Sequence, residues 1–250
     1  MRVKAIVAYD GTDYSGFQRQ SNAESIQAAL ETALAKLVGE AVRVLGSGRT
    51  DAGVHAAGQV VAFDVSWRHE LASLQRAMNA LLPAAIAVLS VEAAAANFDP
   101  RRHAHSRWYR YSIYNAPARN PLSNRYSLHV PQALDVTAMQ AAAASLLGWH
   151  DFSAFGSPPQ GSNAVREVLR AEWQQADTCL TFDIVANAFL FRMVRMLVGT
   201  MLRVGQGALT PQRFAEILHT QDRSAAGPAA GARGLTLMAV HYNALTESGT

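Results

Sequence analysis

The chain has 250 residues, of which half are hydrophobic and 16% are charged, with a formal net charge of +3. This length and balance predict a folded globular protein of one large or two modest domains, and they exclude a disordered chain. The single cysteine, Cys179, excludes a disulfide framework and a zinc knuckle. The amino-terminal segment lacks a signal-peptide pattern, and the most apolar segment, residues 186–205, carries several arginines. We therefore expect a cytoplasmic protein without a membrane span.

The first half of the chain alternates strand-like and helix-like segments. Ser21 and Glu24 have capping-box spacing at the start of the first helical pattern, and Pro83 stops the second. In chain order we expect a strand over 2–10, a helix over 21–39, strands over 41–48 and 59–65, a helix over 69–83 and a strand over 85–94.

The second half repeats this scheme loosely, with a hairpin pattern that indicates antiparallel pairing. We expect a strand over 107–115, a helix over 135–148, a hairpin over 166–187 turning near Asp177, a long helix over 188–205, a short helix capped at Thr210 and Pro211, and a closing strand over 234–243. The small-residue loop 224–234 is the best candidate for local mobility. The pattern predicts an α+β protein of two similar halves, residues 1–103 and 104–250, with largely antiparallel sheets covered by helices.

Arginines gather in residues 101–115, where they alternate with aromatic side chains such as Trp108, Tyr109 and Tyr111. Arginine binds phosphate through a planar fork and stacks on bases, so basic residues mixed with aromatics are typical of proteins that grip unstacked nucleotides. The arginine-rich, lysine-poor composition also has a second explanation, the base composition of the genome.

The stretch "GSGRTDAGVHAAGQV", residues 46–60, surrounds Asp51 with glycine and alanine. An Arg49 guanidinium beside the carboxylate would favour its ionised form and fix its direction. An aspartate before small residues can equally be a turn residue that bonds its own backbone. The glycines would leave room for a ligand to approach the backbone.

Several cofactor and metal motifs are missing from the chain. The "GSGRTD" run departs from both the dinucleotide fingerprint and the phosphate-binding loop, so we expect no nucleotide cofactor. His103 and His105 have no third ligand at a familiar spacing, so we expect no metal.

The sequence resembles the transfer-RNA pseudouridine synthase A family. The run "GRTDAGVHA" matches the family signature without a break, and further segments resemble other family blocks in the same order. These segments are "YDGTDYSGFQRQ", "FDPRRHAHSRWYRYSIYN", "GWHDFSAF", "ANAFLFRMVRMLVGTMLRVG" and "GLTLMAVHY". Phe191, Arg192 and Met196 depart from the family pattern of the long helix and put its secondary RNA contacts in question.

The resemblance implies that the chain isomerises uridine to pseudouridine in the anticodon stem-loop of tRNA, at nucleotides thirty-eight to forty. It implies a pseudouridine synthase fold with an active-site cleft between the two halves, no cofactor and a homodimer. Asp51 would be the catalytic aspartate, paired with Arg49, and Tyr109 would contact the target base. Arg195 would be the basic residue of the long helix at the same site. We add Arg107 and Arg110 as candidate phosphate contacts, with Arg101 and Arg102 beside them.

Two other functions stay open on the residues alone. One is an RNA-binding module without catalysis, built on the basic and aromatic strand. The other is a glycosidase that uses Asp51 with Asp10 or Asp13 as a pair of carboxylates. The sequence also leaves open whether Asp51 attacks the base, attacks the sugar or removes a ribose proton. For His55 we expect a role in bracing the loop rather than in catalysis.

Overall fold

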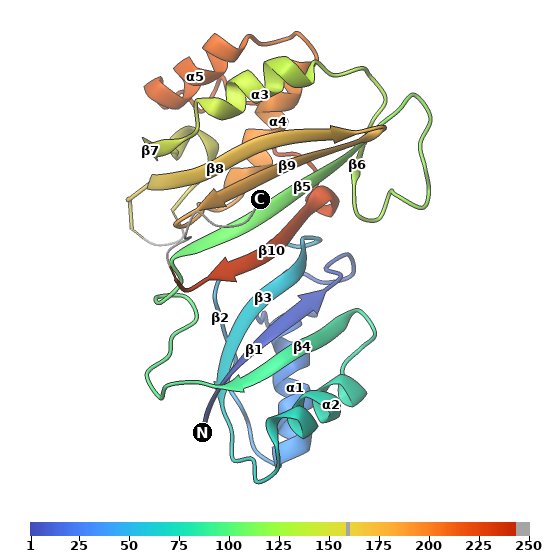
Figure 1. The fold of residues 1–250 in the computed structure, drawn as a ribbon, viewed down its shortest axis with the longest axis vertical. Coiled ribbons are helices and arrows are strands. Elements are labelled where there is room, and N and C mark those ends of the chain that lie inside the picture. The colour runs from blue at the N-terminus through green and yellow to red at the C-terminus, as the bar shows by residue number, and fades with distance from the viewer. Residues whose placement is uncertain (159–160, 244–250) are drawn as a thin grey trace. The chain divides into compact units, whose positions relative to one another are not determined.

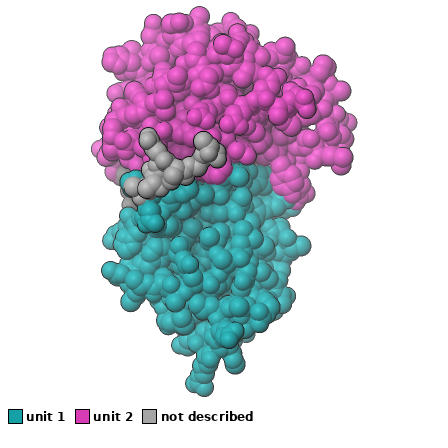
Figure 2. Space-filling model, in the orientation of Figure 1, with its two compact units in different colours: residues 1–105, 236–250 teal, residues 106–235 magenta. Residues whose placement is uncertain are grey.

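The structure is a computed structural model that describes residues 1–158 and 161–243. Its backbone divides into two compact units, coloured separately in Figure 2. Unit 1 comprises Met1–His105 and the chain from Thr236 onward, and unit 2 comprises Ser106–Leu235. The boundary expected at residues 103 and 104 falls close to Ser106, but the closing strand, which we assigned to the second half, lies in unit 1.

Unit 1 is built on a sheet whose strands are mostly antiparallel (Figure 1). Strand β1 lies between β4 and β3 and pairs antiparallel with both. The closing strand β10 pairs in parallel with the start of β3, through Thr236 and Leu237. The strands of this unit are β1 (Arg2–Tyr9), β2 (Leu45–Gly46), β3 (His55–Asp64), β4 (Ile86–Ala93) and β10 (Leu235–His241).

Two helices, α1 (Ile26–Val38) and α2 (Leu71–Leu81), pack on each other beside this sheet (Figure 1). The expected cap at Ser21 is wrong, because α1 begins later. The Ser25 side chain accepts a hydrogen bond from the backbone N–H of Ala28 and so caps the first turn. Helix α2 buries Leu74 and Met78 and ends just before Pro83, as its apolar spacing predicts.

The strands of unit 2 also pair mostly antiparallel. The expected hairpin is confirmed: β8 and β9 pair antiparallel, and Asp177 in the turn between them has a φ of 51°. Strand β5 pairs antiparallel with β9 from Arg107 to Tyr114, and it pairs in parallel with the short β6. The strands are β5 (Ser106–Asn115), β6 (Leu128–Val130), β7 (Gly148–Asp151), β8 (Val165–Ala176) and β9 (Cys179–Ala186).

Helices α3 (Val136–Ala144), α4 (Met193–Gly205) and α5 (Pro211–Thr220) pack together in unit 2 (Figure 1). Short 3₁₀ turns stand at Ser153–Phe155 and Ala232–Gly234. Helix α4 starts later than expected, because residues 188–191 are not helical and Arg192 before the helix has a φ of 62°. The sheets and their helices confirm the α+β class, and within the described chain no helix is both long and apolar enough to span a membrane.

The small-residue loop 224–234 is packed along α4, contrary to the mobility that its composition predicted. The hydroxyl of Thr200 accepts a hydrogen bond from the N–H of Gly227 at 2.9 Å. A Cβ at Gly199 would overlap the backbone carbonyl of Pro228. Small residues therefore allow the loop backbone to lie directly on the helix.

We predict that Gly199→Ala destabilises the protein by about 1–3 kcal/mol, because the added methyl group must push the loop away from α4. Elsewhere in a helix interior, replacing glycine by alanine stabilises by about 1 kcal/mol, so the sign of the change is informative. Chemical denaturation of the two proteins measures it. An increase in the free energy of unfolding would contradict the close packing.

Candidate active site

Asp51 lies in the loop between β2 and β3 of unit 1, and its side chain is partly exposed. The preceding residue, Thr50, is buried. The carbonyl of Asp51 accepts a hydrogen bond from the N–H of Val54 at 3.1 Å, which closes a tight turn. Gly53 is the third residue of this turn and has a φ of 76°, a conformation that glycine adopts without strain. The turn therefore fixes the backbone on the carboxyl side of Asp51.

A second segment, residues 11–17, holds the Asp51 loop through backbone contacts. The N–H of Phe17 donates to the carbonyl of Thr50 at 3.1 Å, and the N–H of Gly53 donates to the carbonyl of Tyr14 at 3.3 Å. Gly16 has a φ of 93°, and a Cβ on it would lie 2.6 Å from the Thr50 carbonyl oxygen. The two segments thus meet backbone to backbone, on both sides of Asp51.

His55 is buried at the start of β3 and joins the same two segments. Its Nδ1 atom lies 3.2 Å from the backbone nitrogen of Gly11 and 3.1 Å from Oδ1 of Asp10. A neutral ring accepts the Gly11 N–H at this nitrogen, whereas a protonated ring would donate to Asp10 instead. The same Asp10 oxygen accepts two hydrogen bonds from Thr12, at 3.0 and 2.6 Å. These contacts join the start of β3 to the segment around Gly11.

The glycines of residues 46–60 differ in what surrounds them. Gly46 lies against the ring of Phe17, Gly58 lies against a backbone carbonyl of β10, and Gly53 needs its positive φ. At Gly48, in contrast, a Cβ would meet nothing within 4 Å. The interpretation that the glycines leave room for a ligand therefore fits Gly48, whereas the others serve the packing of the loop.

Arg49 lies between Gly48 and Thr50 and is exposed. The expected ion pair between its guanidinium and the Asp51 carboxylate is not formed within the described residues. The Arg49 side chain is exposed, and the backbone hydrogen bonds of Thr50 and Gly53 help to hold the loop.

Tyr109 and Arg107 lie in β5 of unit 2, on the same face of the strand because side chains two residues apart share a face. Tyr109 is 9% exposed, and its ring meets Phe189 edge-on with the centroids 5.0 Å apart. The Arg107 guanidinium donates to the carbonyl of Asn187 at 2.6 Å. Both side chains therefore contact the segment just before α4, of which the sequence placed Phe189 inside the helix and Asn187 at the end of the hairpin.

Arg195 lies in the first turn of α4 and is bound to the loop that packs on the helix. Its Nε donates to the carbonyl of Ala230 at 2.7 Å, and the N–H of Ala230 donates to the carbonyl of Arg195 at 2.9 Å. Burial raises the pKa of Tyr111, and the positive charges of Arg195 and Arg233 partly oppose this effect. Arg195 therefore lies within electrostatic reach of the buried tyrosine two residues after Tyr109.

Arg110 points to the opposite face of β5 and is bound to Asp183 in β9. Its guanidinium makes two hydrogen bonds to the fully buried Asp183 carboxylate, at 2.9 and 2.8 Å, and these raise the pKa of Arg110. The Trp108 indole donates to the same carboxylate at 2.7 Å, and the Arg110 guanidinium lies 5.3 Å from the Trp108 ring. The two guanidinium N–H groups that could bind a phosphate are therefore already bonded to Asp183.

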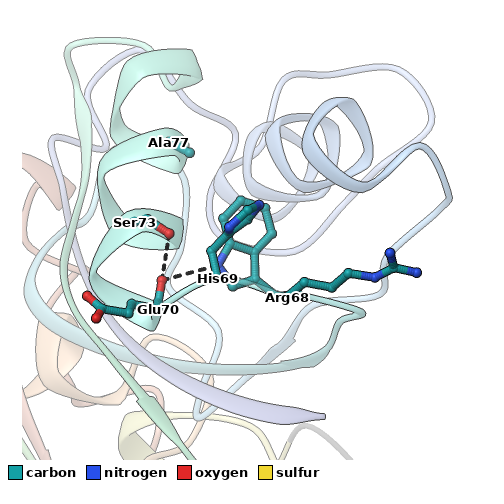
Figure 3. A pocket seen from close by; sticks show the side chains of 6 residues that line it. Arg68, His69, Glu70, Ser73 and Ala77 are labelled. Carbon is teal, nitrogen blue, oxygen red and sulfur yellow. Dashed lines mark hydrogen bonds between the residues drawn. The ribbon is translucent and has the colours of Figure 1, made fainter.

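A pocket in unit 1 is shown in Figure 3, and its lining begins at Trp67, shortly after the carboxyl end of β3 at Asp64. It is lined by the segment that enters α2, including Trp67, His69 and Glu70. The Trp67 indole donates to the backbone carbonyl of Glu70, and Arg68 extends away from α2. Since a strand of ten residues is about 33 Å long, this pocket is separate from the Asp51 loop.

Residues 1–158 and 161–243 contain no group of three or more His, Cys, Asp or Glu side chains placed to hold an ion. His103 instead accepts a hydrogen bond from the backbone N–H of Asp99.

Comparison with known proteins relates this chain to one enzyme family. The family model described as tRNA pseudouridine synthase matches residues 5–101 and 142–243. A tRNA pseudouridine synthase A from Pelobacter propionicus is 43% identical over 96% of this chain and 99% of its own length. Proteins of the same name from Moorella thermoacetica and Streptococcus equi are 42% and 40% identical, each over 96% of this chain and 99% and 98% of their own lengths.

The chain belongs to the tRNA pseudouridine synthase family. This confirms the resemblance that the signature around Asp51 indicated. The segments matched by the family model include Arg49, Asp51 and Arg195, whereas Tyr109 and its strand fall between them.

We predict that Gly16→Ala and Gly48→Ala have different effects on stability. Alanine at residue 16 would be strained by its positive φ and would press on the Thr50 carbonyl, so unfolding should become easier by about 1–3 kcal/mol. Alanine at residue 48 meets nothing within 4 Å, so its effect should stay within about 0.5 kcal/mol. Thermal denaturation of both variants checks this, and equal losses would contradict the clamped loop.

Proposed function

We propose that this protein isomerises uridine to pseudouridine in the anticodon stem-loop of tRNA, at nucleotides thirty-eight to forty, with Asp51 as the catalytic residue. The observation that carries the proposal is the backbone clamp on both sides of Asp51, within a segment matched by the family model. The names of relatives more than 40% identical over nearly the whole chain support the reaction and its substrate.

The reaction breaks the bond between the ribose C1′ and N1 of uracil, turns the base and joins C1′ to C5. The C5 proton is lost and N1 gains one, so atoms balance and nothing is oxidised or reduced. The Asp51 carboxylate attacks the base, attacks the ribose or removes a ribose proton. In each case it must meet the nucleotide from a fixed direction, and a loop held by its backbone supplies that direction.

The target nucleotide must leave its base stack, at a cost of a few kcal/mol. In the proposal, Tyr109 contacts the flipped base and accepts the C5 proton, and Arg195 supplies positive charge. Arg49 is exposed and can contact the RNA or fill the gap that the base leaves. This role replaces the ion pair with Asp51 that we expected from the sequence.

The other arginines divide into two groups. Arg107 lies on the same face of β5 as Tyr109 and stays a candidate phosphate contact. Arg110 neutralises the buried Asp183 and therefore fits a structural role better than phosphate binding. The homodimer and the cytoplasmic location are predictions that follow from the family resemblance.

Tritium release from tRNA that carries 5-tritiated uridine tests this function. We expect the native protein to release tritium and Asp51→Asn to release it at least about a hundredfold more slowly, because the substitution removes the reactive carboxylate. Binding of tRNA should be kept, since the two side chains have the same shape. The control is Asp64→Asn, which makes the same change at an exposed residue at the far end of β3 and should keep full activity.

The outcomes separate the three candidate functions. An RNA-binding module would bind tRNA but release no tritium in its native form. A glycosidase would release free uracil, and its second carboxylate would have to come from Asp10 or Asp13. The contacts of Asp10 with Thr12 and His55 argue against it as that partner. Full tritium release by Asp51→Asn would contradict the catalytic role of Asp51.

A further inference from the structure

Gln59 is a fully buried polar residue in the middle of an apolar stretch of β3. The residues that follow it, Val60 to Phe63, are buried and hydrophobic. A buried amide must bond all its polar atoms to offset the loss of water, so it is costly unless its partners are fixed. An apolar side chain would suit this strand better if burial were its whole role.

The hydrogen bonds of Gln59 reach the loop that carries Asp51. Its Oε1 accepts from the hydroxyl of Ser47 at 2.6 Å, and its Nε2 donates to the carbonyl of Gly48 at 3.2 Å. The same Nε2 lies 3.5 Å from the hydroxyl of Tyr9 in β1. The amide orientation is determined, because the Gly48 carbonyl needs a donor and so must face the nitrogen.

Tyr9 extends the contact to the other side of Arg49. Its hydroxyl lies 2.8 Å from Oγ1 of Thr50, the residue before Asp51. Burial raises the pKa of Tyr9 to about 12, so the hydroxyl keeps its proton at neutral pH and acts as a hydrogen-bonding group. Gln59 and Tyr9 thus bind Gly48 and Thr50, while segment 11–17 binds the loop from another direction.

We propose that Gln59 is a positioning residue for Asp51, which it orients by holding the Gly48 carbonyl directly and Thr50 through Tyr9. This inference rests on the proposed function, since it concerns the placement of the same carboxylate. The network holds Gly48 and Thr50, which precede Asp51, and the turn at Gly53 holds the backbone that follows it. A carboxylate on a loop held at these points needs no reorganisation when the nucleotide arrives.

The test compares Gln59→Leu with Gln75→Leu in the full-length protein. Gln75 in α2 also donates from Nε2 to backbone carbonyls, those of Val88 and Leu89 at 3.1 and 2.7 Å, but it has no contact with the Asp51 loop. We expect Gln59→Leu to lower the single-turnover rate of tritium release by about tenfold to a hundredfold, because small misplacement of a reactive group is costly. Affinity for tRNA should change less than about twofold, as the substrate contacts stay in place. Gln75→Leu should keep both values.

A second variant, Gln59→Glu, gives a readout that a purely structural role would not produce. The protonated carboxylic acid can donate to the Gly48 carbonyl, as the amide does, whereas the carboxylate cannot. Activity relative to the native protein should therefore rise as the pH falls from 8 to 6, since burial favours the neutral acid. This variant also decides the matter if Gln59→Leu does not fold.

The results distinguish this inference from the proposed function. Native protein that releases no tritium would contradict the function itself. With an active native protein, a Gln59→Leu rate equal to the native rate would overturn the positioning role alone. A loss of tRNA affinity without a loss of rate, or a Gln59→Glu activity ratio independent of pH, would overturn it as well.

Discussion

The close approach of two backbone segments in unit 1, residues 11–17 and 48–54, is the constraint on which the candidate site depends. Glycine makes it possible, because a Cβ at Gly16 would lie 2.6 Å from the Thr50 carbonyl and one at Gly11 would overlap Val54. Backbone hydrogen bonds then hold the loop together with the side-chain contacts of Gln59 and Tyr9. The Arg49 side chain stays exposed, and the Asp51 carboxylate is presented by a loop whose backbone is held in place.

In unit 2, glycines likewise allow two backbone segments to approach closely beside Arg195. Gly199 and Gly227 let the loop 225–231 lie on the backbone of α4, so that the Ala230 carbonyl reaches the Arg195 guanidinium. In unit 1 main-chain atoms of a neighbouring segment hold the Asp51 loop, and in unit 2 they bind the Arg195 side chain itself. A main-chain atom is a dependable partner, because its position is fixed by the fold and not by a rotamer.

Much of this architecture was predictable from the sequence, and the failures have physical causes. Periodicity located β1, the β8–β9 hairpin and α2, because their apolar faces are buried by local neighbours. It missed the start of α4, since the apolar run before Met193 is not helical, although it includes the buried Leu190. The composition of loop 224–234 predicted local mobility. Its small residues instead allow it to pack closely on α4.

In the candidate site, too, the sequence indicated some residues and missed others. The signature located Asp51, since its residues are adjacent in the chain. The Arg110–Asp183 pair and the Gln59–Tyr9 contact join residues of different strands, which a single sequence does not bring together. A polar residue within an apolar strand was the one signal that marked Gln59.

Hydrogen exchange of the free protein tests most directly whether the Asp51 loop is rigid before substrate binds. We predict that the amides of Phe17, Gly53 and Val54 are protected as strongly as those in the core of β3. Exchange at the rate of exposed loops would contradict this account.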